Sequence, residues 1–399
     1  MNSTYIIQGM YNNNSFQHNS NISRVADVIW RNATVSRAEI SRQLSLYRST
    51  VSNIIGTLLE NGVVLETSVA SASASGGRKP ITLTLNAALG CVIGIEIQPE
   101  TYHVVAIDIN GEVLLHKHGL TCKADFVEIF DTIYDDCEVE IKKLNLPVLA
   151  ICVGIPGIID TTNNLILRSD PFKLENFDFE AEISSKFDIP VLIENDARCC
   201  AWADKTRNRS EGLRDFITVM AEHHIGQSND EIVKAGLGVG IALCSNGKLH
   251  HGYQFAAGEY VSHSWRPGII GQTGLPEEIT SRIGSDLHSF RKWVVEFFFT
   301  LTPILTVFAP EKLYIHGYPV QYKNIVLQTI QSAVPQFSAI LKKNNCTMEF
   351  APVDNTVVAR GAACYYVNKL FSISEPNEQG NLKVQTNWDN LFSTLANSK

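Results

Sequence analysis

The order in which apolar segments follow one another constrains the fold most, because the same order occurs twice. Each occurrence has two short runs rich in branched apolar side chains, of the kind that form neighbouring strands, and a turn that leads to a third short segment. These segments lie at residues 91–97, 104–109 and 112–116, and again at residues 216–220, 238–243 and 248–250. Further buried strands are expected at 148–153, 191–193 and 313–316, and helices at 293–308 and 358–370. The repetition predicts a duplicated α/β fold.

The first 85 residues have a different pattern of three helices and a hairpin. Ser36 with Glu39 three residues later is typical of a capping box at the start of a second helix. The third helix is expected from Arg48 to Glu60, with an apolar stripe on one side. Two β-branched runs, 63–67 and 81–85, flank a loop of small residues that carries Arg78 and Lys79. This order predicts a winged helix-turn-helix.

Charge separates this N-terminal part from the rest of the chain. The whole protein has a net charge of −8, whereas residues 1–85 carry seven basic and four acidic side chains. An acidic protein with a basic N-terminal part is expected to bind nucleic acid only through that part.

The polar face of the third helix is the candidate for reading DNA. In a helix-turn-helix the N-terminal residues of the second helix of the motif meet base edges in the major groove. Arginine pairs with guanine and asparagine with adenine, while serine and threonine suit bases or phosphates. The expected contacts are Arg48, Ser49, Thr50, Ser52 and Asn53, with Arg37, Arg78 and Lys79 on phosphates or in the minor groove. A polar face used for protein contacts is the alternative.

Several observations bear on the compartment and on metal. The nine cysteines include no CxxC pair, and the first 21 residues have no basic segment followed by an apolar one. No run of about 18 apolar residues is present. We therefore expect a cytoplasmic protein without disulfides and without a membrane partner.

With these motifs in view, the chain resembles the ROK family of repressors, open reading frames and kinases, and within it the NagC/XylR-type regulators. The resemblance runs from about residue 22 to residue 371. It rests on segments of the head and on four of the body: Gly154-Ile-Pro-Gly157 with Asp160, Glu194-Asn-Asp-Ala197, Gly236-Leu-Gly-Val-Gly240 and Ala257-Gly-Glu259.

The resemblance implies an N-terminal winged helix-turn-helix followed by a duplicated actin-like (ribonuclease H-like) sugar-kinase fold. A sugar would then lie between two lobes, held by Gly157, Asn195, Asp196 and Glu259, with His263 as a further contact. The expected divisions are a disordered tail at 1–20, the DNA-binding domain at 21–86, a first lobe at 87–205, a second lobe at 206–355 and a C-terminal tail at 373–399. A helix at about 356–372 is expected to pack back on the first lobe.

The chain departs from the family pattern at two places. Where kinase members have a glycine-rich loop for ATP phosphates, this chain reads Glu96-Ile-Gln-Pro-Glu100, which lacks glycine and adds carboxylates. The cysteines of the family's zinc segment are missing after Glu259. We therefore expect no catalysis, no cofactor and no metal.

The functional hypothesis is a sugar-responsive repressor of carbohydrate-utilisation genes. Its partners would be a double-stranded DNA operator, a sugar or sugar derivative as effector, and a second copy of the chain in a homodimer or higher oligomer. Two alternatives stay open: an ATP-dependent sugar kinase that retains a DNA-binding head, and a regulator controlled by a protein partner.

Overall fold

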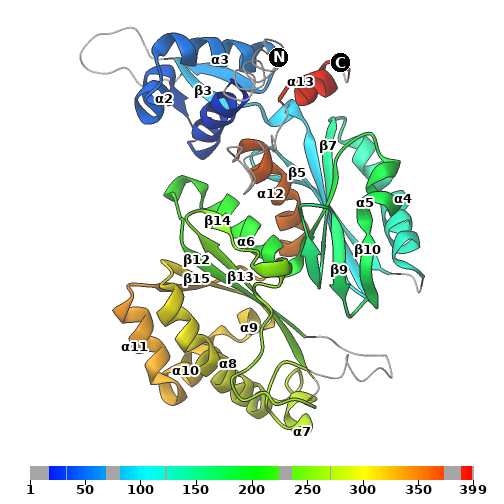
Figure 1. The fold of residues 1–399 in the computed structure, drawn as a ribbon, viewed down its shortest axis with the longest axis vertical. Coiled ribbons are helices and arrows are strands. Elements are labelled where there is room, and N and C mark those ends of the chain that lie inside the picture. Colours follow the sequence, from blue (N-terminus) through cyan, green and yellow to red (C-terminus); the bar gives the residue numbers. More distant parts are fainter. Residues whose placement is uncertain are drawn as a thin grey trace, which may run out of the picture.

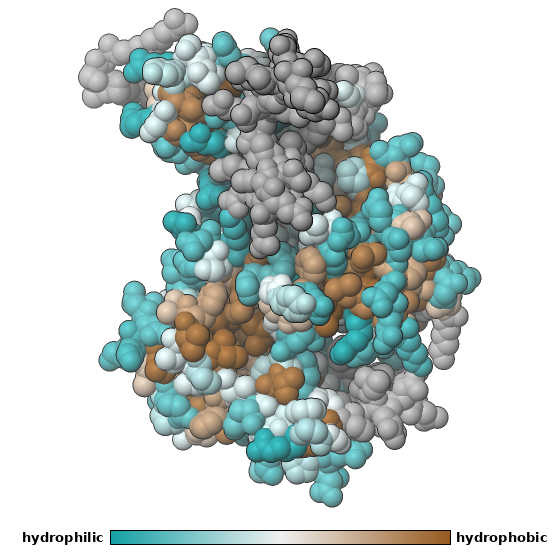
Figure 2. Space-filling view, viewed as in Figure 1, coloured by the Kyte–Doolittle hydropathy of each residue, from teal (hydrophilic) through white to brown (hydrophobic). Residues whose placement is uncertain are grey.

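The computed structural model describes residues 18–32, 34–68, 81–121, 124–223, 236–269, 271–372 and 388–397. Figure 1 shows a small head at one end, formed by the N-terminal segment, and two lobes that follow one another along the long axis. Polar side chains cover much of the face in Figure 2, and apolar ones gather in patches on both lobes.

The head is a winged helix-turn-helix. Residues 18–31 are helical and are followed by α2 (Arg37–Leu44) and α3 (Arg48–Glu60). A three-stranded sheet has the order β1-β3-β2, with β1 at Val35–Ser36, β2 at Val64–Ser68 and β3 at Ile81–Leu85. The capping box at the start of α2 is present in both directions between Ser36 and Glu39. The capping box fixes where α2 begins, and it therefore helps to set the orientation of α3, which follows α2 after a short turn.

Lobe 1 is built on a five-stranded sheet of order β11-β7-β4-β5-β6. The strands β4 and β5 are antiparallel, as are β5 and β6, whereas β7 runs parallel to both β4 and β11. Helix α4 (Phe126–Lys143) covers one face of the sheet. The strands are β4 (Cys91–Ile97), β5 (Thr101–Asp108), β6 (Val113–Leu120), β7 (Val148–Ile155) and β11 (Val191–Asn195).

Lobe 2 repeats this topology in its own five-stranded sheet, of order β14-β13-β12-β15-β16. In both lobes three antiparallel strands are followed along the chain by two parallel ones. If the strands of each lobe are numbered 1 to 5 along the chain, their order across the sheet is 3-2-1-4-5. The strands are β12 (Phe216–His223), β13 (Leu237–Ser245), β14 (Lys248–Leu249), β15 (Lys312–Gly317) and β16 (Thr347–Phe350). Its main helices are α8 (Leu287–Phe308), α10 (Lys323–Ala333) and α11 (Pro335–Lys343). The predicted duplicated actin-like fold is confirmed.

Two helices pack tightly on the inner face of lobe 1. Helix α12 (Val357–Phe371) lies on β4 and against α6 (Asp196–Arg207). A Cβ atom on Gly361 would lie 1.9 Å from the carbonyl oxygen of Cys199, and one on Gly94 would lie 1.9 Å from that of Ala359. Glycine at these two positions permits the close approach of helix to helix and of helix to sheet.

The smaller elements were not anticipated from the sequence. A second sheet in lobe 1 has the order β10-β9-β8, and short helices connect the larger elements. These elements are β8 (Ile158–Asp160), β9 (Leu165–Ser169), β10 (Leu174–Asp178), α5 (Phe179–Glu182), α7 (Glu277–Thr280) and α9 (Tyr318–Gln321).

The C-terminal segment corrects one expectation. Part of the expected tail is a helix, α13 (Trp388–Asn397), with Trp388, Leu391 and Leu395 buried at helical spacing. The Trp388 indole N–H donates to Ser23 Oγ at 2.9 Å, so α13 packs on the first helix of the head. That first helix already includes residues 18–20, which were expected to be disordered. The apolar surface of α13 decides this, because it adds to the core shared by the head and α12.

Candidate functional site

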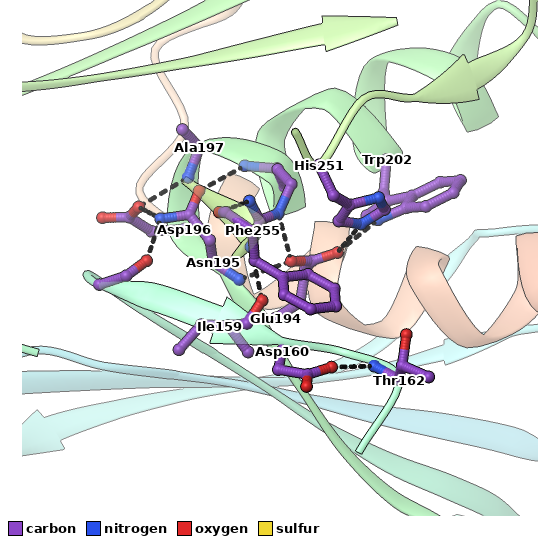
Figure 3. A network of polar contacts seen from close by, with 12 residues as sticks. Ile159, Asp160, Thr162, Glu194, Asn195, Asp196, Ala197, Trp202, His251 and Phe255 are labelled. Carbon is purple, nitrogen blue, oxygen red and sulfur yellow. Dashed lines mark hydrogen bonds and ion pairs between the residues drawn. The ribbon is translucent and has the colours of Figure 1, made fainter. Parts of the chain in front are cut away.

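The predicted sugar contacts begin where β11 ends and α6 starts. Asn195 caps α6, because its Oδ1 accepts from the backbone N–H of Arg198 at 3.0 Å. Its amide Nδ2 donates to the carbonyl oxygen of Gly157 at 3.0 Å and to Asp196 Oδ1 at 2.9 Å (Figure 3). The structure therefore brings Gly157, Asn195 and Asp196 together on lobe 1.

Gly157 is required by its surroundings. It has φ 143°, and a Cβ atom there would lie 2.4 Å from the carbonyl oxygen of Arg168 on β9. No L side chain fits this position without moving β9. The loop after β7 is thereby held close enough for its carbonyl to meet Asn195.

Lobe 2 contributes Glu259 to the same place. Glu259 forms a β-bridge with Gly240 of β13, and the backbone N–H of Ile241 donates to the carbonyl oxygen of Gly258. A Cβ atom on Gly240 would lie 2.8 Å from Ala197 Cβ and 3.9 Å from Asp196 Oδ1. Residues from both lobes therefore meet across Gly240.

The carboxyl group of Glu259 perturbs that of Asp196. Burial and the negative charge of Glu259 raise the pKa of Asp196 to about 6. Burial also raises the pKa of Glu259. A pair of carboxyl groups beside an amide can accept from, and donate to, neighbouring hydroxyl groups, which is the chemistry that a sugar presents.

A buried ion pair below these residues escaped the sequence reasoning. Glu194 and Arg198 are almost completely buried, and Arg198 Nε donates to Glu194 Oε1 at 2.6 Å. The other nitrogens of Arg198 reach the carbonyl oxygens of Phe255 in lobe 2 and Ile159 in lobe 1. Burial alone would favour the neutral acid, but Arg198 and His251 together outweigh it and the pKa of Glu194 falls to about 2. The i, i+4 spacing of the pair was the available signal.

The region that corresponds to the absent phosphate loop is crowded with acids. Glu96 is 6% exposed on β4, and burial together with the nearby Glu222 raises its pKa to about 8. The pKa of Glu222, at the end of β12, is raised to about 7 by burial and by Asp196. Glu222 was not foreseen, because only the tertiary structure brings the end of β12 beside the end of β4. The carboxyl groups of Glu96, Glu222 and Asp196 therefore crowd together at this place.

His263 lies apart from the polar cluster, which consists of Gly157, Asn195, Asp196 and Glu259. Its exposed ring lies against α8, where Nδ1 is 2.8 Å from Thr300 Oγ1 and the ring centroid is 4.8 Å from that of Phe299. Glu296 of α8 accepts from Ser262, Ser264 and the backbone N–H of Gly274, and so anchors the loop after Glu259. In the described part of the chain, no group of three or more His, Cys, Asp or Glu residues is arranged to hold a metal ion.

The candidate DNA-reading residues share one exposed face of the head. Arg48, Ser49, Ser52 and Asn53 are exposed on α3, and Thr50 is partly exposed. Tyr47, which precedes α3, is 85% exposed and was missed as a candidate. Arg37 is engaged in an ion pair with Glu66 of β2 at 2.7 Å. Arg78 and Lys79 lie outside the described residues.

The model of the ROK family matches residues 92–263, which include the first lobe, Asn195, Asp196 and Glu259. The chain belongs to the ROK family. Among curated proteins it is 28% identical over 244 residues to a xylose repressor of Caldicellulosiruptor bescii, covering 60% of this chain and 57% of that protein. It is 30% identical over 279 residues to a xylose repressor of Staphylococcus xylosus, covering 67% and 64%. The matches thus span less than two thirds of either repressor.

A solved structure of a ROK family transcriptional regulator, a homologue of the E. coli Mlc protein, has the same overall fold. It superposes with a TM-score of 0.65 at 16% identity and covers 96% of this ROK chain and 99% of its own. At that identity the likeness establishes the fold alone. Among the described residues, no helix is both long and apolar enough to span a membrane.

Proposed function

We propose that this ROK protein is a sugar-responsive DNA-binding repressor that does not phosphorylate its sugar. The observation that carries the proposal is the position of α6. The helix begins at Asn195 and Asp196 in the polar cluster, and about 18 Å further along, Arg209 just beyond its end contacts the head. A ligand that moves the start of α6 would therefore displace the contact with the DNA-binding head.

The effector is a small sugar bound between Asn195 and Asp196 on one side and Glu259 on the other. Such a site would discriminate against analogues that lack a hydroxyl, because its buried polar groups would be left unpaired. The names of the curated relatives favour a pentose such as xylose. The exposed face of α3 would read an operator, and a two-fold homodimer in the cytoplasm would match a pseudo-palindromic site.

The positions of Glu96 and Glu222 support the proposal that the protein transfers no phosphoryl group. Their carboxyl groups lie beside Asp196, so nucleotide phosphates would meet carboxyl oxygens in place of backbone amide donors. Asp196 is then a ligand contact and not a catalytic base.

Thermal-shift measurements on the full chain against a panel of monosaccharides test the sugar site. One sugar should raise the melting temperature, because ligand binding to the folded state stabilises it by about 2.7 kcal/mol at a hundredfold excess over Kd. Asp196→Asn and Glu259→Gln should abolish this shift, whereas Glu175→Gln on the exposed strand β10 should retain it. The same sugar should weaken binding to DNA fragments selected from a random pool. The proposal fails if no sugar changes stability or DNA affinity.

The kinase alternative is tested with the same sugar. ADP release measured by a coupled assay should not exceed the rate without protein. Turnover that depends on Asp196 would show that the protein is a kinase.

A further inference from the structure

A cavity of about 220 Å³ lies where the head meets lobe 1, separate from the polar cluster between the lobes. Three parts of the chain form its wall: the end of the first helix with β3, the turn after β5, and the segment at the end of α6. The polar and charged residues that matter here are Trp30, Arg31, Asn110, Arg207, Arg209 and Ser210. The cavity therefore touches both the DNA-binding head and the helix that begins at the sugar site.

Three guanidinium groups line this cavity, and they are not fully neutralised. Arg31 pairs with Asp27 at 2.8 Å, and Arg207 pairs with Asp204 at 3.2 Å. Arg209 differs, because its Nε and a terminal nitrogen donate to the carbonyl oxygens of Trp30 and Thr206. No carboxylate of the described chain forms an ion pair with Arg209. One positive charge in the wall is therefore left uncompensated.

Trp30 adds a second, independent observation. It is 5% exposed, and in the described part of the structure its indole N–H has no hydrogen-bond partner. A buried donor left unpaired destabilises the folded protein. Trp30 thus closes the wall beside the guanidinium groups, and these groups favour a ligand made of acceptor oxygens.

We propose that this cavity is a second ligand site, which binds the phosphate group of a small phosphorylated metabolite or free phosphate. Guanidinium groups match phosphate oxygens in geometry and charge, and hydrogen bonds of this kind are the stronger ones. The volume is below the roughly 300 Å³ at which pockets for drug-sized ligands begin, so the ligand is small. Because the wall comes from the head and from the end of α6, the bound anion ties the head to lobe 1.

Isothermal titration of the full-length protein in phosphate-free buffer tests the site, with inorganic phosphate, glucose 6-phosphate and glucose as probes at constant ionic strength. Ser210 is exposed at the cavity wall, and its side chain makes no hydrogen bond with the described residues. Ser210→Asp should weaken phosphate binding about tenfold or more, because the new carboxylate adds a negative charge to the wall that repels the phosphate. Ser210→Asn is the neutral control of the same shape and should bind as the wild type does.

The probes distinguish the source of the phosphate. Equal affinity for both phosphate-bearing probes identifies the phosphate group alone as the ligand, and tighter binding of glucose 6-phosphate identifies a phosphorylated metabolite. Absence of saturable binding, or equal binding by the Asp and Asn variants, overturns the proposal. Binding that Asp196→Asn abolishes and Ser210→Asp preserves also overturns it, because the probe then occupies the cleft. These results leave the proposed sugar response unaffected.

Discussion

Arg209 joins the end of α6 to the first helix of the head through Trp30. Its Nε–H donates to the backbone carbonyl oxygen of Trp30 at 3.1 Å, and its guanidinium carbon lies 5.6 Å from the centroid of the indole ring. Trp30 also packs on Phe371 of α12, with ring centroids 5.3 Å apart. The head is thus held on two helices that also border the polar cluster.

Arg209→Lys is expected to uncouple the sugar from the DNA. Lysine keeps the charge but loses the planar group that bonds the carbonyl and stacks on the ring. Sugar affinity should be unchanged, while the sugar-dependent change in DNA affinity, commonly about 5- to 150-fold for coupled sites, should fall at least about fivefold. Fluorescence anisotropy with and without sugar measures both quantities. Arg214→Lys is the control, and equal coupling in both variants would contradict the role of Arg209.

Arg48→Ala should impair DNA binding without affecting the fold. Arg48 is exposed at the start of α3, and a bidentate contact with a base contributes about 1–3 kcal/mol, or about 5- to 150-fold in affinity. Gel-shift titration measures the loss, and circular dichroism checks the fold. Arg282→Ala in lobe 2 removes the same charge from an exposed site and should bind DNA normally. If both variants bind equally well, α3 is not the reading helix.

Glu96→Gln should stabilise the protein more at pH 8 than at pH 5. The folded-state pKa of Glu96 is raised to about 8, so the folded protein holds this proton more tightly than the unfolded chain does. Stability is therefore highest below the unfolded pKa and is lost as the pH rises toward 8. A tenfold difference in proton affinity between the folded and unfolded protein corresponds to about 1.4 kcal/mol, or roughly 3–6 °C for a domain of 150–250 residues.

The measurement is the difference in melting temperature between the variant and the wild type from pH 5 to pH 8. It should grow by at least about 3 °C over this range. The exposed Glu175→Gln should give a constant difference. A difference for Glu96→Gln that does not change with pH would show that Glu96 titrates normally.

Trp388→Ala should loosen the head. The side chain is completely buried and bonds Ser23, and truncating a buried tryptophan costs about 3–5 kcal/mol. Hydrogen exchange of residues 18–31 should accelerate, while that of the lobe 2 strands should not change. Removing only residues 398–399 is the control. Unchanged protection of residues 18–31 would show that α13 does not support the head.

Much of the fold could be predicted from the sequence, because the bounds of individual helices and strands depend on local patterns of residues. The bounds of α3 and β4 match the expected ones, and Ser36 with Glu39 caps α2 as predicted. The helix α13 could have been found from the spacing of Trp388, Leu391 and Leu395, yet its partner could not. Nothing near Trp388 in the chain indicates that it lies on Ser23, 365 positions away.

The sequence by itself determined the order of the elements, the polar face of α3 and the absence of glycine between Glu96 and Glu100. These properties depend on residues close together in the chain, where spacing alone fixes which side chains share a face. Only the tertiary structure decided which distant groups meet. It set Glu222 beside Glu96, Glu259 across Gly240 from Asp196, and Arg209 on Trp30. Such contacts depend on how two lobes and a head pack together, and the energies of buried charges follow from that packing.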